Sequence, residues 1–166
     1  MTTPADDVDR IVEAWTRERP DLDITPLEVL SRVTRIAKRV DKFRREAFKT
    51  SHLESWEFDV LAALRRAGDP YQLSPKSLMA ETLVSSGAMT HRLRKLEERG
   101  FISRSSDPHD GRGGVVRLMP SGRDAVDLAF ATLIDAEHSL ITALAPSERA
   151  TVARALRSLS LNVENR

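Results

Sequence analysis

The sequence predicts a mainly helical fold that carries one small β-hairpin. Apolar residues recur at helical spacing over most of the 166-residue chain. Between residues 101 and 119, two short segments flank a polar, glycine-rich stretch at 107–114, which is the pattern of a hairpin. A chain of this length forms one domain, or one protomer of an intertwined dimer.

An N-terminal helix is expected within residues 1–24. Its apolar side chains fall at positions i, i+3, i+4 and i+7: Val8, Ile11, Val12 and Trp15. The helix ends before Pro20, because proline lacks the N–H group that a helix needs. We expect the Trp15 ring to be buried against another helix.

A long helix is expected over residues 25–50. Thr25, Pro26 and Glu28 have the pattern of a capping box with proline at the first helical position. Apolar residues then recur at helical spacing: Leu30, Val33, Ile36, Ala37, Val40 and Phe43. At 1.5 Å per residue the helix spans roughly 35 Å. A helix of that length braces either a dimer or the centre of the fold.

A third helix is expected at residues 55–67, where apolar side chains cover most of the circumference. Gly68 and Pro70 end it. Asp59 lies beside the apolar arc, and a surface carboxylate is the ordinary interpretation of such a position.

The central stretch of residues 51–119 has the outline of a winged helix-turn-helix. A short helix opens with Ser74 as its cap and Pro75 at the first helical position. A tight turn at 82–85 leads into a second helix, which ends at Gly100. Two helices joined by so few residues indicate a helix-turn-helix, and the hairpin that follows would be its wing.

The second helix of this pair has two different faces when its residues are placed 100° apart. Met89, Leu93 and Leu96 form a narrow apolar stripe that must face the core. A neighbouring sector is small, polar or basic: Ser86, Gly87, Thr90, His91 and Arg94. Such a sector suits a helix in the major groove of DNA, although an ordinary solvated helix face has a similar composition. Arg92 lies on the other flank of the stripe, pointing inward or sideways.

Duplex DNA is therefore the expected partner of the central stretch. The residues expected to contact it are Ser85, Ser86, Thr90, His91, Arg94, Lys95 and Arg112. Arg112 lies at the hairpin tip, where an arginine suits a narrow minor groove. Asp107 or Asp110 would hold its guanidinium group through a bidentate pair. The alternative is a solvated loop whose charges contribute little.

Residues 120–166 are expected to form two dimerisation helices, one at 121–144 and one from Pro146 onward. Their apolar faces have little surrounding chain to pack against, so a symmetry mate would bury them. Met119 and Ala145 precede these helices without a capping side chain, at a cost of about 1 kcal/mol each.

Residues 74–112 resemble the winged helix-turn-helix core of the MarR-family transcriptional regulators. The wing signature of that family is similar to the DPHDGR motif at 107–112, followed by an apolar strand and Gly122. Met119 departs from the family pattern, in which a threonine cap is common. The resemblance extends over nearly the whole chain and implies the homodimer of that family.

A narrower resemblance concerns a ligand. The segment at 15–24, the long helix and the segment at 57–68 are similar to the urate-responsive subgroup, whose members carry an extra N-terminal helix. This resemblance implies a ligand site made by one tryptophan, one aspartate and two arginines, which fall on Trp15, Asp59, Arg92 and Arg104. An aromatic face and a guanidinium suit a flat anion such as urate, another purine or a small organic acid. Alternatively, Trp15 packs in the core and Arg92 forms a structural ion pair with Asp59.

We therefore expect a homodimeric repressor that a small anionic aromatic or organic-acid ligand releases from a near-palindromic operator. Such an anion would compete with the salt bridge between Arg92 and Asp59 and tilt the reading helix. Two alternatives are a regulator of this family that answers a different effector or none, and a winged-helix module for protein contacts.

Composition argues against several other classes. The net charge is +1, so nucleic-acid affinity must come from local charge, and the absence of cysteine excludes disulfides and thiolate metal sites. The histidines lack metal-ligand spacing: His52, His91, His109 and His138. With no phosphate loop or nucleophile elbow, we expect no enzyme, no cofactor and no metal. We see no membrane span or signal peptide and expect a cytoplasmic protein.

Overall fold

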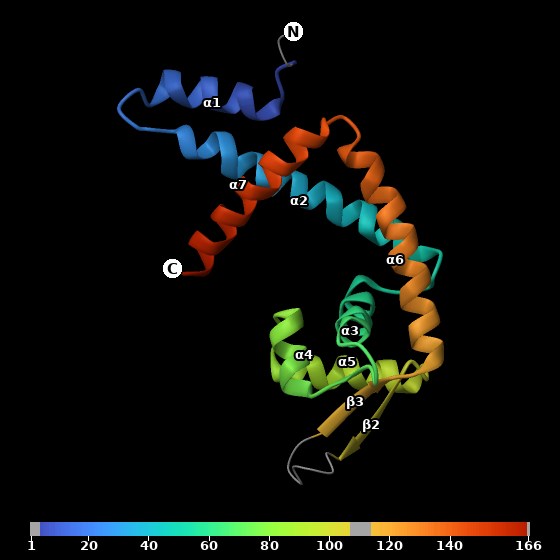
Figure 1. Cartoon of the computed structure of the whole chain (residues 1–166). Coiled ribbons are helices and arrows are strands. Elements are labelled where there is room, and N and C mark those ends of the chain that lie inside the picture. The colour runs from blue at the N-terminus through green and yellow to red at the C-terminus, as the bar shows by residue number, and fades with distance from the viewer. Residues whose placement is uncertain (1–3, 107–113, 166) are drawn as a thin grey trace. The chain divides into compact units, whose positions relative to one another are not determined.

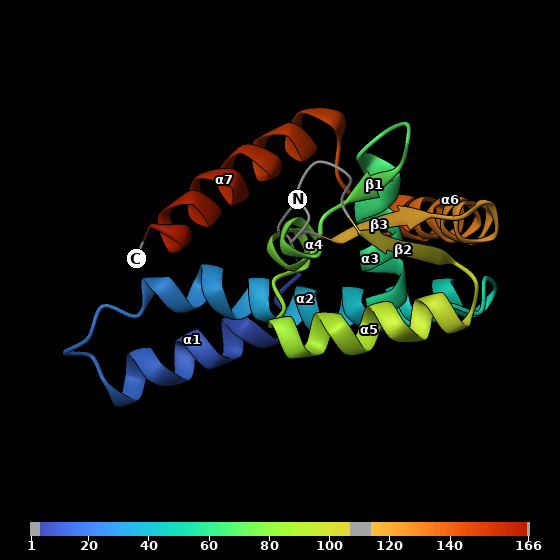
Figure 2. The same cartoon turned by 90° about the horizontal axis from the view of Figure 1, so that it is seen from below.

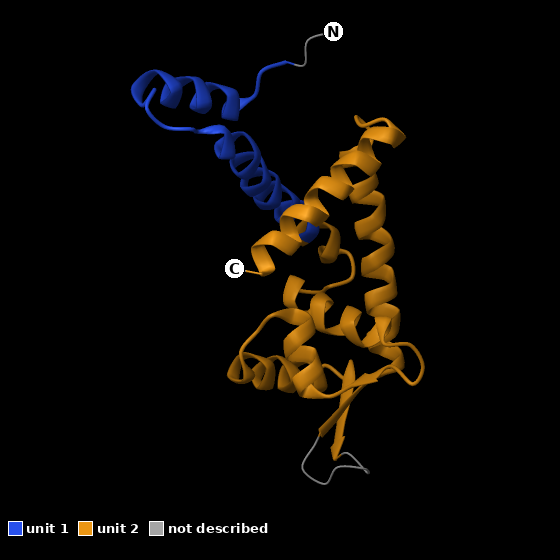
Figure 3. Ribbon diagram, turned by 60° about the vertical axis from the view of Figure 1, so that its left-hand side comes forward, with its two compact units in different colours: residues 1–44 blue, residues 45–166 orange. Residues whose placement is uncertain are grey.

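The computed structural model describes residues 4–106 and 114–165 and divides into two compact units, residues 1–44 and 45–166 (Figure 3). Figure 1 labels the elements along the chain. In order they are α1 (Asp7–Glu18), α2 (Thr25–Lys49), α3 (Ser55–Arg66), β1 (Gln72–Leu73), α4 (Pro75–Thr82), α5 (Ser86–Glu98), β2 (Ile102–Ser106), β3 (Gly114–Leu118), α6 (Pro120–Ile141) and α7 (Pro146–Glu164). The first unit holds α1 and most of α2, and the second unit holds the rest.

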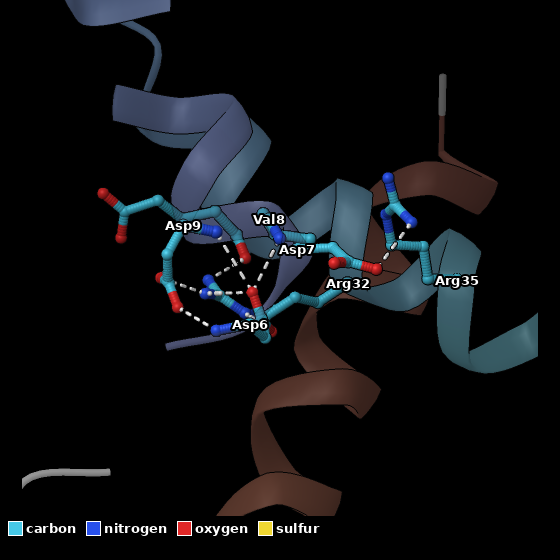
Figure 4. A network of polar contacts seen from close by, with 7 residues as sticks. Asp6, Asp7, Val8, Asp9, Arg32 and Arg35 are labelled. Carbon is cyan, nitrogen blue, oxygen red and sulfur yellow. Dashed lines mark hydrogen bonds and ion pairs between the residues drawn. The ribbon is translucent and has the colours of Figure 1, made fainter. Parts of the chain in front are cut away.

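In the first unit, charged groups join the start of α1 to α2 (Figure 4). The Asp6 carboxylate accepts the N–H groups of Val8 and Asp9 at 2.7 and 3.1 Å, and the Asp9 carboxylate accepts the Asp6 N–H at 2.7 Å, so Asp6 and Asp9 form a capping box. Arg32 of α2 donates to the carboxylates of both Asp6 and Asp9. The Arg32 guanidinium lowers the pKa of the Asp6 carboxyl from 3.8 to about 2. Beneath this network Val8 is buried.

Two predictions for the first unit are wrong. Trp15 is 50% exposed, so its ring is not buried against another helix. Thr25 does not cap α2 but is its first residue, and its N–H and hydroxyl both donate to the Asp23 carboxylate, at 3.0 and 2.8 Å. Asp23 therefore supplies the capping oxygen that the sequence pattern assigned to Thr25. Aspartate and threonine side chains can both accept hydrogen bonds from the free N–H groups at a helix start, so the pattern does not decide between them.

The centre of the second unit is α3, which packs against α4, α5, α6 and β3 (Figures 1 and 2). Its apolar residues are buried as the periodicity predicts, and the ring of Phe58 stacks on that of Phe48 with 4.4 Å between centroids. The core around α3 also takes in Leu78 of α4, Ile102 of β2 and Val126 of α6. A single apolar core thus joins the helix pair, the sheet and the start of α6.

The predicted hairpin is present as β2 and β3, which pair antiparallel with Ile102 opposite Leu118 and Ser106 opposite Gly114. A third strand, β1, pairs with the other edge of β3, giving the order β1-β3-β2. This strand was not predicted, because two residues are too few to show an alternating pattern. β3 is therefore the central strand of a three-stranded sheet.

The start of α6 lies directly against the turn that follows α5. The Met119 N–H donates to the Phe101 carbonyl at 2.9 Å, and the Ser121 hydroxyl donates to the Gly100 carbonyl at 2.7 Å. A β-carbon on Gly122 would lie 2.2 Å from the Phe101 oxygen, so only glycine fits here. The end of α5 and the beginning of α6 form one rigid joint.

The two C-terminal helices expose much of their apolar surface. Neither Met119 nor Ala145 provides a side-chain cap, as predicted, although the Glu148 carboxylate accepts the Ala145 N–H at 2.6 Å. The exposed apolar residues are Leu128, Phe130, Ile134, Leu140 and Ile141 on α6 and Val152, Leu156, Leu161 and Val163 on α7. In the described part of the chain no single helix is long and apolar enough to cross a membrane, and α6 and α7 meet that test only as a pair bent by 106°.

The joint between α5 and α6 can be tested by substitution. Gly122→Ala is expected to lower the free energy of unfolding by about 1–3 kcal/mol, because the added methyl group must displace the Phe101 carbonyl. Urea unfolding followed by circular dichroism measures this change. Gly87→Ala is the matched control: its β-carbon meets nothing within 4 Å, and alanine favours a helix by about 0.5–1 kcal/mol. Unchanged stability of Gly122→Ala would contradict the joint.

Candidate nucleic-acid interface

Helices α4 and α5 are joined by the tight turn that the sequence predicts. The Ser74 hydroxyl accepts the Ser77 N–H at 3.0 Å, so the predicted cap of α4 is present, and the Ser85 hydroxyl, which was not predicted as a cap, accepts the Ala88 N–H of α5 at 3.4 Å. Gly100, just beyond α5, has a φ of +71°, the left-handed conformation expected of a helix end. The local signals therefore place α5 within one residue of its predicted limits.

One face of α5 is fixed against the core. Met89, Leu93 and Leu96 are all buried, as predicted. The six predicted contact residues on and just before this helix are all exposed: Ser85, Ser86, Thr90, His91, Arg94 and Lys95. The phase of the helix is thus the one predicted from its sequence.

The exposed side chains hold few bonds that a ligand would have to break. The Thr90 hydroxyl donates to the Ser86 carbonyl at 3.0 Å, so its methyl group and lone pairs remain available. Arg94 lies 3.3 Å from His91 Nδ1 and 3.7 Å from a Glu98 oxygen, in a solvent-exposed pair of little net energy. A helix start also has four N–H groups without helical acceptors, and Ser85 satisfies only one of them.

A groove of about 530 Å³ separates α5 from the hairpin. Thr90 lines one wall, and Arg104, Ser105 and Ser106 of β2 line the other. Arg104 Nε is 3.3 Å from a Glu97 oxygen in an exposed pair. The two serines were not among the predicted site residues; their polar, outward run beyond the buried Ile102 is the signal that could have identified them. Hydroxyl and guanidinium groups around such a groove suit phosphate oxygens.

The three predicted residues at the hairpin tip, Asp107, Asp110 and Arg112, lie outside the described residues.

The four predicted ligand residues are divided between the two units. Trp15 is in the first unit, and Asp59, Arg92 and Arg104 are in the second. Arg92 is half-buried, with its guanidinium carbon 5.7 Å from the centre of the Trp56 ring, which confirms its sideways orientation. Sequence reasoning missed Trp56, because nothing local shows that α3 and α5 cross at these two residues.

An ion pair between a buried carboxylate and a partly exposed arginine anchors the C-terminal end of α5. Glu57 of α3 is 3% exposed, and its carboxylate accepts from Arg99 at 2.6 Å and from the Glu54 N–H at 2.9 Å. Arg99 also donates to the His52 carbonyl at 3.0 Å and lies over the Phe101 ring at 4.4 Å. This network holds the base of α5 to the start of α3 while its N-terminal end faces solvent.

Comparisons with known proteins agree with this geometry. A sequence profile described as the MarR family matches residues 53–113. The HTH-type transcriptional regulator PecS of Dickeya dadantii is 31% identical over 143 residues, 86% of each chain. The structure of Bordetella bronchiseptica BpsR, described as regulated in its DNA binding by 6-hydroxynicotinic acid, is 26% identical, with a TM-score of 0.62 over 78% of this chain and 98% of that one. A mutant of E. coli MarR complexed with operator DNA is 24% identical, with a TM-score of 0.70 over 83% and 99%.

The anchor of α5 predicts a stability effect. Arg99→Met is expected to lower the free energy of unfolding by about 1–3 kcal/mol, because the Glu57 carboxylate stays buried without its cation. Adding Glu57→Gln should recover part of the loss, since a neutral amide is cheaper to bury. The control is Arg94→Met, which removes an exposed pair and should cost less than about 0.5 kcal/mol. If urea unfolding gives equal losses for Arg99→Met and Arg94→Met, the anchor is not structural.

Proposed function

The chain belongs to the MarR family of DNA-binding transcriptional regulators, and we propose that it is a ligand-responsive repressor that binds a near-palindromic operator as a homodimer. The observation that carries this proposal is the exposed sector of α5, which the buried stripe of Met89, Leu93 and Leu96 keeps turned outward. Its family and its relatives are regulators of transcription, not enzymes.

In the proposed complex, the N-terminal half of α5 enters the major groove. Thr90 and His91 lie nearest the base edges, and Ser85, Ser86, Arg94 and Lys95 contact phosphates or flanking bases. Arg112 enters the neighbouring minor groove, where the potential is most negative. The sugar-phosphate backbone lies along the groove between α5 and β2, next to Arg104, Ser105 and Ser106.

The proposed dimer would bury the apolar residues that α6 and α7 expose. No residue of α7 is buried in the single chain, although Val152 and Leu156 repeat at helical spacing. A two-fold axis brings the same face of each protomer together and places the two reading helices about one turn of DNA, ~34 Å, apart.

The proposed effector is a small anionic aromatic or organic acid, with urate and other purines among the candidates. We assign it to Trp15, Asp59, Arg92 and Arg104. Two features of the second unit support this class of ligand. The Arg92 guanidinium lies beside the Trp56 ring, and the Arg104 side chain lines the groove between α5 and β2, where Thr90 also lies. An anion that binds these arginines would favour one orientation of α5 over another. A ligand that binds one orientation more tightly than the other changes the affinity of the protein for DNA.

Binding to DNA is tested with the intergenic duplex beside the gene of this protein. Arg94→Ala and Arg112→Ala should each weaken binding and lower the slope of log affinity against log salt by about 1 for each protomer, because each removes a cation that neutralises phosphate charge. Fluorescence anisotropy at several salt concentrations measures the slope. Arg17→Ala removes an exposed arginine of α1 and serves as the matched control. An unchanged slope for both test variants would contradict the proposed contacts, and a wild type that binds no duplex would favour a protein-interaction module.

The effector site makes a separate prediction. A panel of urate, xanthine and small aromatic acids first identifies a compound that releases wild-type protein from its duplex. Arg92→Ala should then bind the duplex as wild type does but stay bound when that compound is added, because Arg92 is off the DNA-facing sector. Normal release of Arg92→Ala would remove this residue from the proposed site.

A further inference from the structure

Leu83, in the turn between α4 and α5, is in an unusual position for a leucine. Its φ and ψ are 53° and 43°, the left-handed conformation that residues with a β-carbon rarely adopt. It is also 92% exposed, whereas the other exposed large apolar residues of the described chain are between 37% and 64% exposed. Glycine would avoid both the backbone strain and the contact of a large apolar group with water.

The other strained residues have contacts that account for them. In the described part of the chain, left-handed non-glycine residues are His52, Tyr71 and Leu83. The His52 carbonyl accepts from Arg99, and the Tyr71 ring receives the guanidinium groups of Arg65 and Arg123 at 5.1 and 5.9 Å. The Leu83 side chain gains almost no burial within the chain. The left-handed backbone serves to cap α4, but a large apolar side chain that stays in water, at a position that glycine fills without strain, points to a contact outside the fold.

The backbone holds Leu83 in place at the DNA-facing end of α5. The N–H groups of Leu83 and Val84 both donate to the Met79 carbonyl, the latter at 3.3 Å. Ser85, the cap of α5, follows two residues later, so Leu83 lies within about 11 Å of the first helical residue. Its side chain is thus presented on a fixed turn, beside the polar residues assigned to DNA contact.

We propose that Leu83 makes an apolar contact with operator DNA at the edge of each half-site, against a thymine methyl group or the face of a deoxyribose. This inference rests on the proposed function and adds to it a residue that the polar and basic pattern of α5 does not include. The thymine methyl is the one apolar group that the bases present in the major groove, and side-chain carbon atoms are what recognise it. A contact of this kind contributes to sequence preference, which phosphate contacts do not.

The test compares Leu83→Ala, Leu83→Gly and Leu83→Met on the intergenic duplex that wild type binds. Leu83→Ala and Leu83→Gly should weaken binding about fivefold or more, since each removes several carbon atoms from the contact, whereas Leu83→Met should stay within about twofold of wild type. Leu83→Gly should have a Tm equal to or above that of wild type, because the strain is relieved and almost no buried surface is lost. Loss of affinity without loss of stability separates a DNA contact from a structural role.

A second arm of the experiment identifies the group on the DNA. Thymines of the duplex are replaced one at a time by deoxyuridine, which removes only the methyl group. A replacement that weakens wild type but not Leu83→Ala supports the methyl group, and insensitivity of wild type to every replacement, with Leu83→Ala still weakened, supports the deoxyribose. Wild-type affinity for Leu83→Ala and Leu83→Gly would overturn this inference and leave the proposed function intact. A wild type that binds no duplex would overturn the proposed function, and this inference with it.

Discussion

The burial of Met89, Leu93 and Leu96 is the constraint on which the rest of the site depends. Each of these side chains contributes about 1.5–3 kcal/mol through burial, so turning α5 on its axis would cost several kcal/mol. Exposed polar and charged pairs on the opposite face contribute about 1 kcal/mol or less each and cannot offset that cost. The apolar stripe therefore decides which side chains face solvent, and Ser86, Thr90 and Arg94 face it as a consequence.

The two ends of α5 have different surroundings. At the C-terminal end, Arg99 joins α3 through the buried Glu57, and the Gly100–Phe101 turn receives the start of α6 so closely that only glycine fits at 122. At the N-terminal end, the helix begins on a short turn with free N–H groups and exposed side chains. Because the buried stripe and the Arg99 network both hold α5 to the core, a displacement of α3 or α6 would carry the whole helix with it.

Much of the fold could be predicted because its signals are local. Ser74 with Pro75, Ser85 and Gly100 set the limits of two helices through chemistry within a few residues, and the spacing of Met89, Leu93 and Leu96 set the phase of α5. The features that were missed depend on residues distant in the chain. Glu57 and Arg99 are 42 positions apart, Arg92 meets Trp56 only because α3 and α5 cross, and β1 exists only because β3 offers it an edge. The capping oxygen of Asp23 was missed for another reason: several nearby side chains could fill that role.

Amide hydrogen exchange of the full chain, free and bound to its operator duplex, shows whether the start of α5 contacts DNA. The first amides of α5, at Ser86 and Gly87, have no helical acceptors and are expected to exchange rapidly in the free protein. We expect the duplex to slow these amides and those of the 83–85 turn, while those of α3 keep their rates. Unchanged exchange at 83–88 in the saturated complex, with protection confined to other elements, would contradict it.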